Sequence, residues 1–288
     1  MRTSATGIGT LALAAAGTLA ASRPLPVPDV MSAPFASLLT AAPAGGALAW
    51  VLKQDGARNV WVAEPREYAG RRLTSYAGDD GQELAALEFT PDGRALVYVR
   101  GGGPNRGGEI PNPLSDPAGA TQAIWLVPLS GGEPRKLADG AAPAVSPRGD
   151  GVAFVKAGQV WSVPLVQGEA AQLQLVKARG TARALRWSPD GSKLAFTSDR
   201  GDHAFVGVYD TVAKAIRWLD ASVDRDIAPA WSPDGSSVAF VRQPASPRAI
   251  GFVPQREGTP WSIRVADAAS GRGREVFRAK PGRGGRNR

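Results

Sequence analysis

The apolar residues of this chain gather in five short runs that are hydrophobic at nearly every position. Short runs that do not alternate with polar residues are typical of β-strands that are buried on both faces. The runs lie at residues 48–51, 96–99, 152–155, 194–197 and 238–241. Because no helical pattern separates them, the layers that cover each strand are predicted to be further sheets.

A turn sequence precedes each run at a constant distance. A proline is followed two residues later by glycine and seven residues later by an aromatic residue. The prolines are Pro43, Pro91, Pro147, Pro189 and Pro233, and the aromatic residues are Trp50, Tyr98, Phe154, Phe196 and Phe240. Successive prolines are 42 to 56 residues apart, the spacing of a supersecondary unit that stacks on copies of itself.

Three copies of this turn carry the full sequence Pro-Asp-Gly, which is typical of a hairpin turn. Proline presets φ at the first turn position, aspartate accepts hydrogen bonds from nearby backbone N–H groups, and glycine adopts a positive φ. The three copies are Pro91, Asp92 and Gly93; Pro189, Asp190 and Gly191; and Pro233, Asp234 and Gly235. Because the aspartates recur at one turn position, we interpret them as structural and not catalytic.

A third and a fourth strand follow in each repeat. The third strands are predicted at 59–62, 123–126, 159–162, 205–209 and 261–265, and cationic outer strands are predicted at 135–137 and 274–277. Small antiparallel sheets stacked in this way form a β-propeller, so the fold class is all-β. We expect about five blades, at residues 36–80, 81–138, 139–178, 179–222 and 223–279, in a ring that is partial or unclosed.

The two ends of the chain differ from the repeats. Arg2 and an alanine-rich apolar run precede small residues, which predicts a signal peptide at 1–22 and a linker at 23–35. A disordered Ala/Gly leader is the alternative. The apolar run is too short for a stable membrane span, and the absence of cysteine excludes a lipoprotein anchor. We therefore expect a secreted or periplasmic protein, with a disordered basic tail at 280–288.

The positive charge of the chain lies mostly outside the repeats. The formal net charge is +8, of which the segment from residue 270 onward supplies +6 and the leader +2. The body between them is neutral, whereas a protein that follows a phosphate backbone carries its basic face on the folded part. Nucleic acid is therefore not an expected partner.

The turn sequences and residues 194–201 resemble the repeats of TolB-type propellers. More narrowly, residues 36–279 resemble the N-terminal propeller of bacterial prolyl oligopeptidase and dipeptidyl peptidase IV-type serine peptidases. This match depends on the order of a signal peptide, a degenerate first repeat and an insertion at 101–113 in the second repeat. The resemblance implies a propeller that caps an α/β-hydrolase domain and restricts its access to peptides.

The chain departs from that family in its chemistry. It contains no G-x-S-x-G nucleophile elbow, and its single histidine, His203, is predicted in a turn of the fourth repeat. No catalytic residue and no cofactor are therefore expected in this chain. Two interpretations remain open: a truncated form of a longer exported peptidase, or a free-standing TolB-like scaffold that binds protein partners.

The glycine- and proline-rich insertion of the second repeat is the first candidate site, because long loops often carry function. By resemblance to peptidases that bind a substrate's ammonium group with propeller glutamates, Glu109 is a substrate-binding candidate. Arg100 and Arg106 are candidates for contacting a carboxylate or another domain. The paired-glutamate motif of those peptidases is absent, so a solvated loop that packs on the hydrolase domain is the alternative.

Two other groups of residues are interpreted as structural. Asp199, Asp202 and His203 lie close in sequence, but hairpin chemistry accounts for them and no further ligand is nearby, so no metal is expected. Seven tryptophans recur at strand positions and are predicted to fill the blades: Trp50, Trp61, Trp125, Trp161, Trp187, Trp231 and Trp261.

Overall fold

The computed structural model describes residues 26–27, 33–105, 107–165, 171–245 and 260–280. The predicted signal peptide, the tail beyond residue 280 and Arg106 lie outside the described residues. The regular elements of the described chain are twenty β-strands, which form three sheets of four strands and one sheet of eight. The predicted all-β fold is therefore confirmed.

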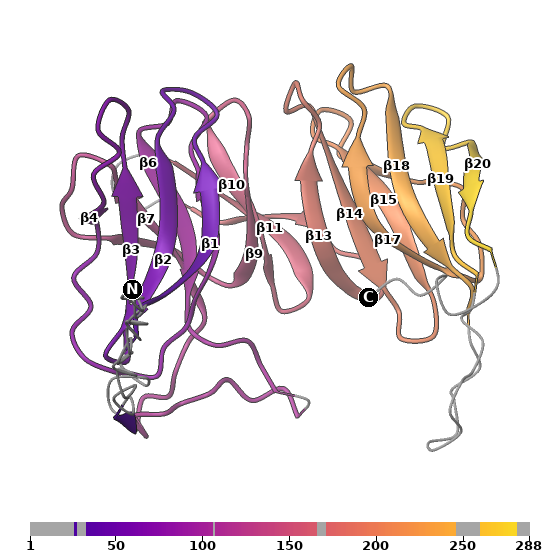
Figure 1. Cartoon of the computed structure of the whole chain (residues 1–288). Coiled ribbons are helices and arrows are strands. Elements are labelled where there is room, and N and C mark those ends of the chain that lie inside the picture. The colour runs from indigo at the N-terminus through magenta and orange to yellow at the C-terminus, as the bar shows by residue number, and fades with distance from the viewer. Residues whose placement is uncertain (1–25, 28–32, 106, 166–170, 246–259, 281–288) are drawn as a thin grey trace, which may run out of the picture.

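The strands form five blades, each a four-stranded antiparallel meander (Figure 1). The first blade has β1 (Phe35–Ala41), β2 (Leu48–Gln54), β3 (Ala57–Ala63) and β4 (Arg71–Arg72), and the second has β5 (Leu84–Phe89), β6 (Ala95–Arg100), β7 (Ala123–Pro128) and β8 (Arg135–Asp139). The third has β9 (Ala141–Val145), β10 (Gly151–Lys156), β11 (Gln159–Pro164) and β12 (Leu173–Val176). The fourth has β13 (Thr181–Trp187), β14 (Lys193–Asp199), β15 (Ala204–Asp210) and β16 (Ala215–Trp218), and the fifth has β17 (Arg225–Trp231), β18 (Ser237–Gln243), β19 (Ser262–Asp267) and β20 (Gly273–Arg278).

The first strand of each blade contacts the first strand of the next. These contacts join β1 to β5, β5 to β9, β9 to β13 and β13 to β17, so the first strands form the inner wall of the arrangement. Blades four and five are also joined by one parallel bridge between Ala204 and Arg225. Among the described strands no pairing joins the fifth blade to the first, which lie at opposite sides of Figure 1. The blades form an open arc, as the sequence predicted.

The repeated turns are built by the same hydrogen bonds in each full copy. In the fourth blade the Ser188 hydroxyl donates to Asp190 Oδ1 (2.6 Å) and accepts from Lys193 N (2.9 Å), while Asp190 Oδ1 also accepts from Ser192 N (3.1 Å). The five glycines of the turns have φ values from +67° to +78°. An L side chain in that region is strained, so glycine is required to return the chain into the next strand.

Neighbouring blades interlock through one aromatic ring and one small residue. Phe240 of the fifth blade packs with Ala195 of the fourth, and both are almost fully buried. The other three blade interfaces pair Tyr98 with Ala49, Phe154 with Val97, and Phe196 with Ala153. Three of these partners are alanine and one is valine, and a small side chain on one sheet leaves room for the ring of the next.

Each inner strand contains a bulge that the sequence did not predict. The register with the second strand shifts by one residue, because the inner strand carries one extra residue there, and the first residue of the bulge has a positive φ of 49° to 56°. These residues are Leu38, Ala86, Ala142, Ala184 and Ala228. None is glycine, so the residue types do not predict this backbone conformation. A positive φ at a residue with a side chain costs on the order of 1 kcal/mol or more at each position. The bulges bend the inner strands where they line the axis.

The turn aspartates predict an acid-sensitive fold. Hydrogen bonds from Ser232 and Ser236 lower the pKa of Asp234 to about 2, and the pKa of Asp190 is lowered in the same way by Ser188 and Ser192. The unfolded chain binds more protons between pH 4 and 2, so the free energy of unfolding falls as pH falls through this window. We expect Asp234→Asn to flatten that fall, measured by urea unfolding at several pH values.

The matched control is Asp150→Asn, which removes the same charge from a turn in which the described residues donate no hydrogen bond to the side chain. Equal slopes for the two variants between pH 4 and 2 would contradict the role of the turn hydrogen bonds.

The interlocking rings predict the largest loss of stability from a single truncation. Phe196 is 1% exposed and Val212 on the outer turn is 86% exposed. Phe196→Ala should lower the free energy of unfolding by about 3–5 kcal/mol through the cavity it leaves. Val212→Ala should change it by less than about 0.5 kcal/mol. Chemical denaturation measures both, and a similar loss for the two would show that blade packing is not limiting.

Candidate functional site

A cleft of about 570 Å³ opens on the inner wall, at the end of the inner strands nearest the repeated turns. Three inner strands line it, because the bulge holds the equivalent position in each strand and the residues around it lie side by side in neighbouring blades. They contribute Ala86, Leu87 and Glu88 from β5; Pro143, Ala144 and Val145 from β9; and Leu185, Arg186 and Trp187 from β13, with Pro147, Ser188 and Pro189 at the rim. The cleft is thus a product of the bulges.

One carboxylate and one guanidinium supply the charge of the cleft. Burial raises the pKa of the Glu88 carboxyl, partly opposed by a hydrogen bond from Val145 N (3.1 Å) and by Arg186. Arg186 is exposed, and its Nη1 donates to its neighbour's carbonyl, Leu185 O (2.8 Å). Glu88 and Arg186 hold the same position in blades two and four, directly before Phe89 and Trp187. The wall therefore presents an acceptor and a donor of opposite charge across β9.

Two tryptophans of the repeat fix this wall by hydrogen bonds between blades. Trp187 Nε1 donates to Ala144 O of the third blade (3.0 Å), and Trp231 Nε1 donates to Arg186 O of the fourth blade (2.9 Å). Both rings are only partly buried. Their interpretation as blade filling was therefore incomplete, since each indole also joins its inner strand to the preceding one. The Glu88 carboxylate joins β5 to β9 in the same manner.

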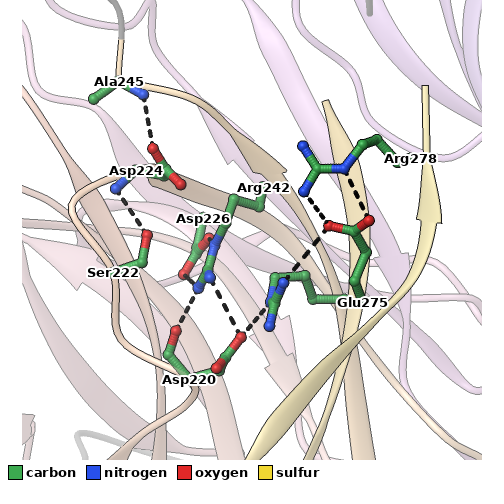
Figure 2. A network of polar contacts seen from close by, with 9 residues as sticks. Asp220, Ser222, Asp224, Asp226, Arg242, Ala245, Glu275 and Arg278 are labelled. Carbon is green, nitrogen blue, oxygen red and sulfur yellow. Dashed lines mark hydrogen bonds and ion pairs between the residues drawn. The ribbon is translucent and has the colours of Figure 1, made fainter. Parts of the chain in front are cut away.

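A network of charged side chains lies inside the fifth blade (Figure 2). Arg242 forms two hydrogen bonds with the fully buried Asp226, from Nε to Oδ1 (2.7 Å) and from Nη2 to Oδ2 (2.8 Å). Arg242 Nη1 lies 3.3 Å from Asp220 Oδ2, and the same oxygen pairs with Arg264. Arg264 lies near Glu275, which Arg278 pairs from the strand surface (2.6 Å). The network crosses from the inner strand to the outer one.

The central pair of this network occupies a register that is apolar or neutral in the neighbouring blade. Asp226 pairs with Arg242 across β17 and β18, and Ala182 pairs with Ser198 at the same place in β13 and β14. Burial raises the pKa of Asp226, against the effect of Arg242. Burial lowers the pKa of Arg242, but Asp226 and other carboxylates outweigh it and raise the value overall. The paired charges are thus a structural feature of one blade.

The structure gives Arg100 and Glu109 separate surroundings. Arg100 forms an ion pair with Asp80 and lies over the Tyr76 ring, 4.3 Å from its centroid. Glu109 is exposed in the insertion, where its carboxylate accepts from Asn105 Nδ2 (3.0 Å) and its backbone N–H donates to Asn105 Oδ1 (3.0 Å). Arg100 is thus held at the end of β6, and Glu109 stabilises a local turn. Their substrate-binding role stays a prediction.

The histidine lies where the sequence placed it, between β14 and β15. His203 Nδ1 lies 2.7 Å from Asp202 Oδ1, and its ring packs edge-on against Phe205 at 4.9 Å between centroids. Asp199 instead pairs with Arg225 (3.2 Å) and Arg183 (3.3 Å). Among the described residues no group of three histidine, cysteine or acidic side chains is arranged to hold a metal ion.

Comparison with known proteins identifies the fold. No protein-family model matches the sequence, and no curated protein matches it. A TolB structure from Agrobacterium tumefaciens shares 18% identity at a TM-score of 0.52, covering 86% of this chain and 82% of that one. TolB from Acinetobacter baumannii shares 17% sequence identity at a TM-score of 0.55, and the alignment covers 86% of this chain and 55% of that one. Dipeptidyl peptidase 4 from Porphyromonas gingivalis shares 14% sequence identity at a TM-score of 0.55, and the alignment covers 84% of this chain and 39% of that one.

The chain thus has a β-propeller fold, and its likeness to the two TolB structures and to the dipeptidyl peptidase is a likeness of fold. It spans most of the first of these structures but about half of the second and less than half of the third. No helix formed by the described residues has the length and apolar character needed to cross a bilayer.

Sequence reasoning missed both charged residues of the cleft. Glu88 and Arg186 stand immediately before the aromatic residue that opens each turn motif, so alignment of the repeats could have paired them. Their position toward the axis depends on the bulge at Ala86 and Ala184, for which the sequence carries no signal.

The buried pair predicts strong coupling between two substitutions. Asp226→Ala leaves Arg242 buried and without its main partner, which should cost about 3–5 kcal/mol of unfolding free energy. Adding Arg242→Ser rebuilds the Ala–Ser pairing of the fourth blade and should recover most of that loss. A double-mutant cycle by chemical denaturation measures the coupling, and additive losses would contradict it.

Proposed function

We propose that this chain is a non-catalytic propeller domain of an exported serine peptidase, in which it filters peptides for an α/β-hydrolase domain. The observation that carries the proposal is the cleft on the inner wall. Its lining is mostly apolar, with one carboxylate and one guanidinium. A concave, mostly apolar surface with few polar groups suits an extended peptide.

The likeness to peptidase propellers supports the same proposal. The Porphyromonas gingivalis dipeptidyl peptidase 4 aligns over 84% of this chain, yet this chain covers only 39% of it. The peptide would enter along the axis and contact Glu88 and Arg186 before reaching the catalytic domain. The Glu88 carboxylate would pair with a peptide's ammonium group, and Arg186 would pair with an acidic group.

A TolB-like scaffold for a protein partner is the second candidate, and the exposed face of the fifth blade favours it. Val206 and Val208 of the fourth blade are buried by the fifth, whereas their equivalents Ile263 and Val265 are only partly buried. The last blade therefore presents the face that, in each earlier blade, is covered by an aromatic ring of the next blade. A partner with an aromatic-bearing sheet would fit there.

Peptide binding by the cleft is the test of the proposed function. We expect fluorescent hexapeptides to bind the purified chain, measured by anisotropy, and Glu88→Gln and Arg186→Gln each to weaken binding about fivefold, or ~1 kcal/mol. Glutamine keeps an oxygen that accepts from Val145 N, so the wall should stay folded. Arg274→Gln on the outer strand removes the same charge as Arg186→Gln and should leave binding unchanged.

The result also separates the two candidates. Loss of hexapeptide binding in the cleft variants supports the peptidase role. If hexapeptides do not bind, or bind equally to all variants, the filtering role is wrong.

A further inference from the structure

A second concave site lies at the opposite end of β13 from the cleft. It has a volume of about 400 Å³ and is formed where the chain enters the fourth blade and where β14 turns into β15. Its lining is Arg179, Gly180, Thr181, Arg183, Asp199, Arg200 and Gly201. We name it the arginine pocket.

The arginine pocket is strongly cationic although the body of the protein is formally neutral. Arg183 and Arg225 both pair with Asp199, at 3.3 and 3.2 Å, so one carboxylate serves two guanidinium groups. Arg179 and Arg200 have no ion-pair partner among the described residues. The neighbouring Asp202 is bound to His203. The pocket thus holds three arginines and one acid, Asp199, which Arg225 also pairs from outside the lining, and this excess of positive charge favours a negatively charged ligand.

Arg200 is held in place before any ligand arrives. Its guanidinium lies over the rings of Phe205 and Trp218, at 4.6 and 5.4 Å from their centroids. Its Nε is buried and has no hydrogen-bond partner among the described residues. A buried N–H without a partner is costly, and a fixed guanidinium loses little freedom when it binds a planar carboxylate. The unpartnered N–H and the fixed position are the properties of a preorganised binding group.

We propose that the arginine pocket binds a carboxylate group of a peptide that occupies the inner wall. This proposal rests on the proposed function, because β13 joins the two sites: Thr181 lies in the pocket and Trp187 in the cleft. Seven extended residues cover about 20 Å, so a peptide of similar length reaches from one site to the other. The carboxylate is either a C-terminal one or that of an acidic side chain.

The experiment compares three hexapeptides of one apolar sequence by isothermal titration calorimetry. One has a free C-terminal carboxylate, one has a C-terminal amide, and one has the amide with a terminal aspartate side chain. We expect the free acid to bind about tenfold more tightly than the amide, and Arg200→Gln and Arg179→Gln to reduce that ratio to about one. The aspartate peptide shows whether a side-chain carboxylate substitutes for the terminal one.

Arg179 is exposed, so Arg179→Gln tests the pocket without removing the packing of Arg200 on its rings. Arg274→Gln is the matched control and should keep the full ratio. If the free acid and the amide bind equally while Glu88→Gln still weakens both, the pocket proposal is wrong and the proposed function stands. The same conclusion follows if both pocket variants keep the preference for the acid.

A second readout makes the pocket testable without the cleft. Titration with N-acetylalanine, a single carboxylate too short to span both sites, should shift the Arg200 Nε–H resonance in the NMR spectrum. If it does so while hexapeptides fail to bind, the proposed function is wrong and the pocket is right. If neither ligand has an effect, both are wrong.

Discussion

The contact on which the structure depends is the insertion of one aromatic ring per blade into a small-residue position of the preceding blade. Tyr98, Phe154, Phe196 and Phe240 are fully or almost fully buried in this way. Each ring buries enough apolar surface to join two sheets that share few or no backbone hydrogen bonds between them. Because the same contact recurs at every interface, the blades add one after another in an arc, and the described residues leave Ile263 and Val265 on the face of the last blade only partly buried.

The rings can interlock only because two local features orient each blade. The repeated turn reverses the chain so that the second strand pairs with the inner strand, and the glycine of the turn has the positive φ that this reversal requires. The bulge then bends the inner strand toward the axis, with a non-glycine residue in a costly conformation at all five positions. This backbone strain recurs in every blade and is tolerated because the surrounding packing holds the bulge in place. The bulges in turn shape the inner wall.

Most of the fold followed from the sequence because its signals are local. Pro189, Asp190 and Gly191 make a turn through hydrogen bonds within a few residues, and the apolar strand that follows is buried on both faces wherever it pairs. Glu88, Arg186 and Arg200 were not predicted, since their roles arise from residues distant in the chain. Glu88 meets Val145 across two blades, and Arg200 meets Trp218 across two strands. A repeat pattern reports what blades share, whereas these contacts differ between blades.

The distribution of charge follows from the same packing. A ring between two sheets leaves no room for an unpaired charge, so the charged side chains that lie inside the fifth blade form a paired network. Asp226 and Arg242 satisfy this condition by two hydrogen bonds, and Ala182 and Ser198 satisfy it without charge. The pocket arginines do not satisfy it among themselves, since Asp199 is the one acid of a pocket lined by three arginines and it also pairs with Arg225. Charge that packing does not require, and that the protein leaves uncompensated, is the charge that a ligand can use.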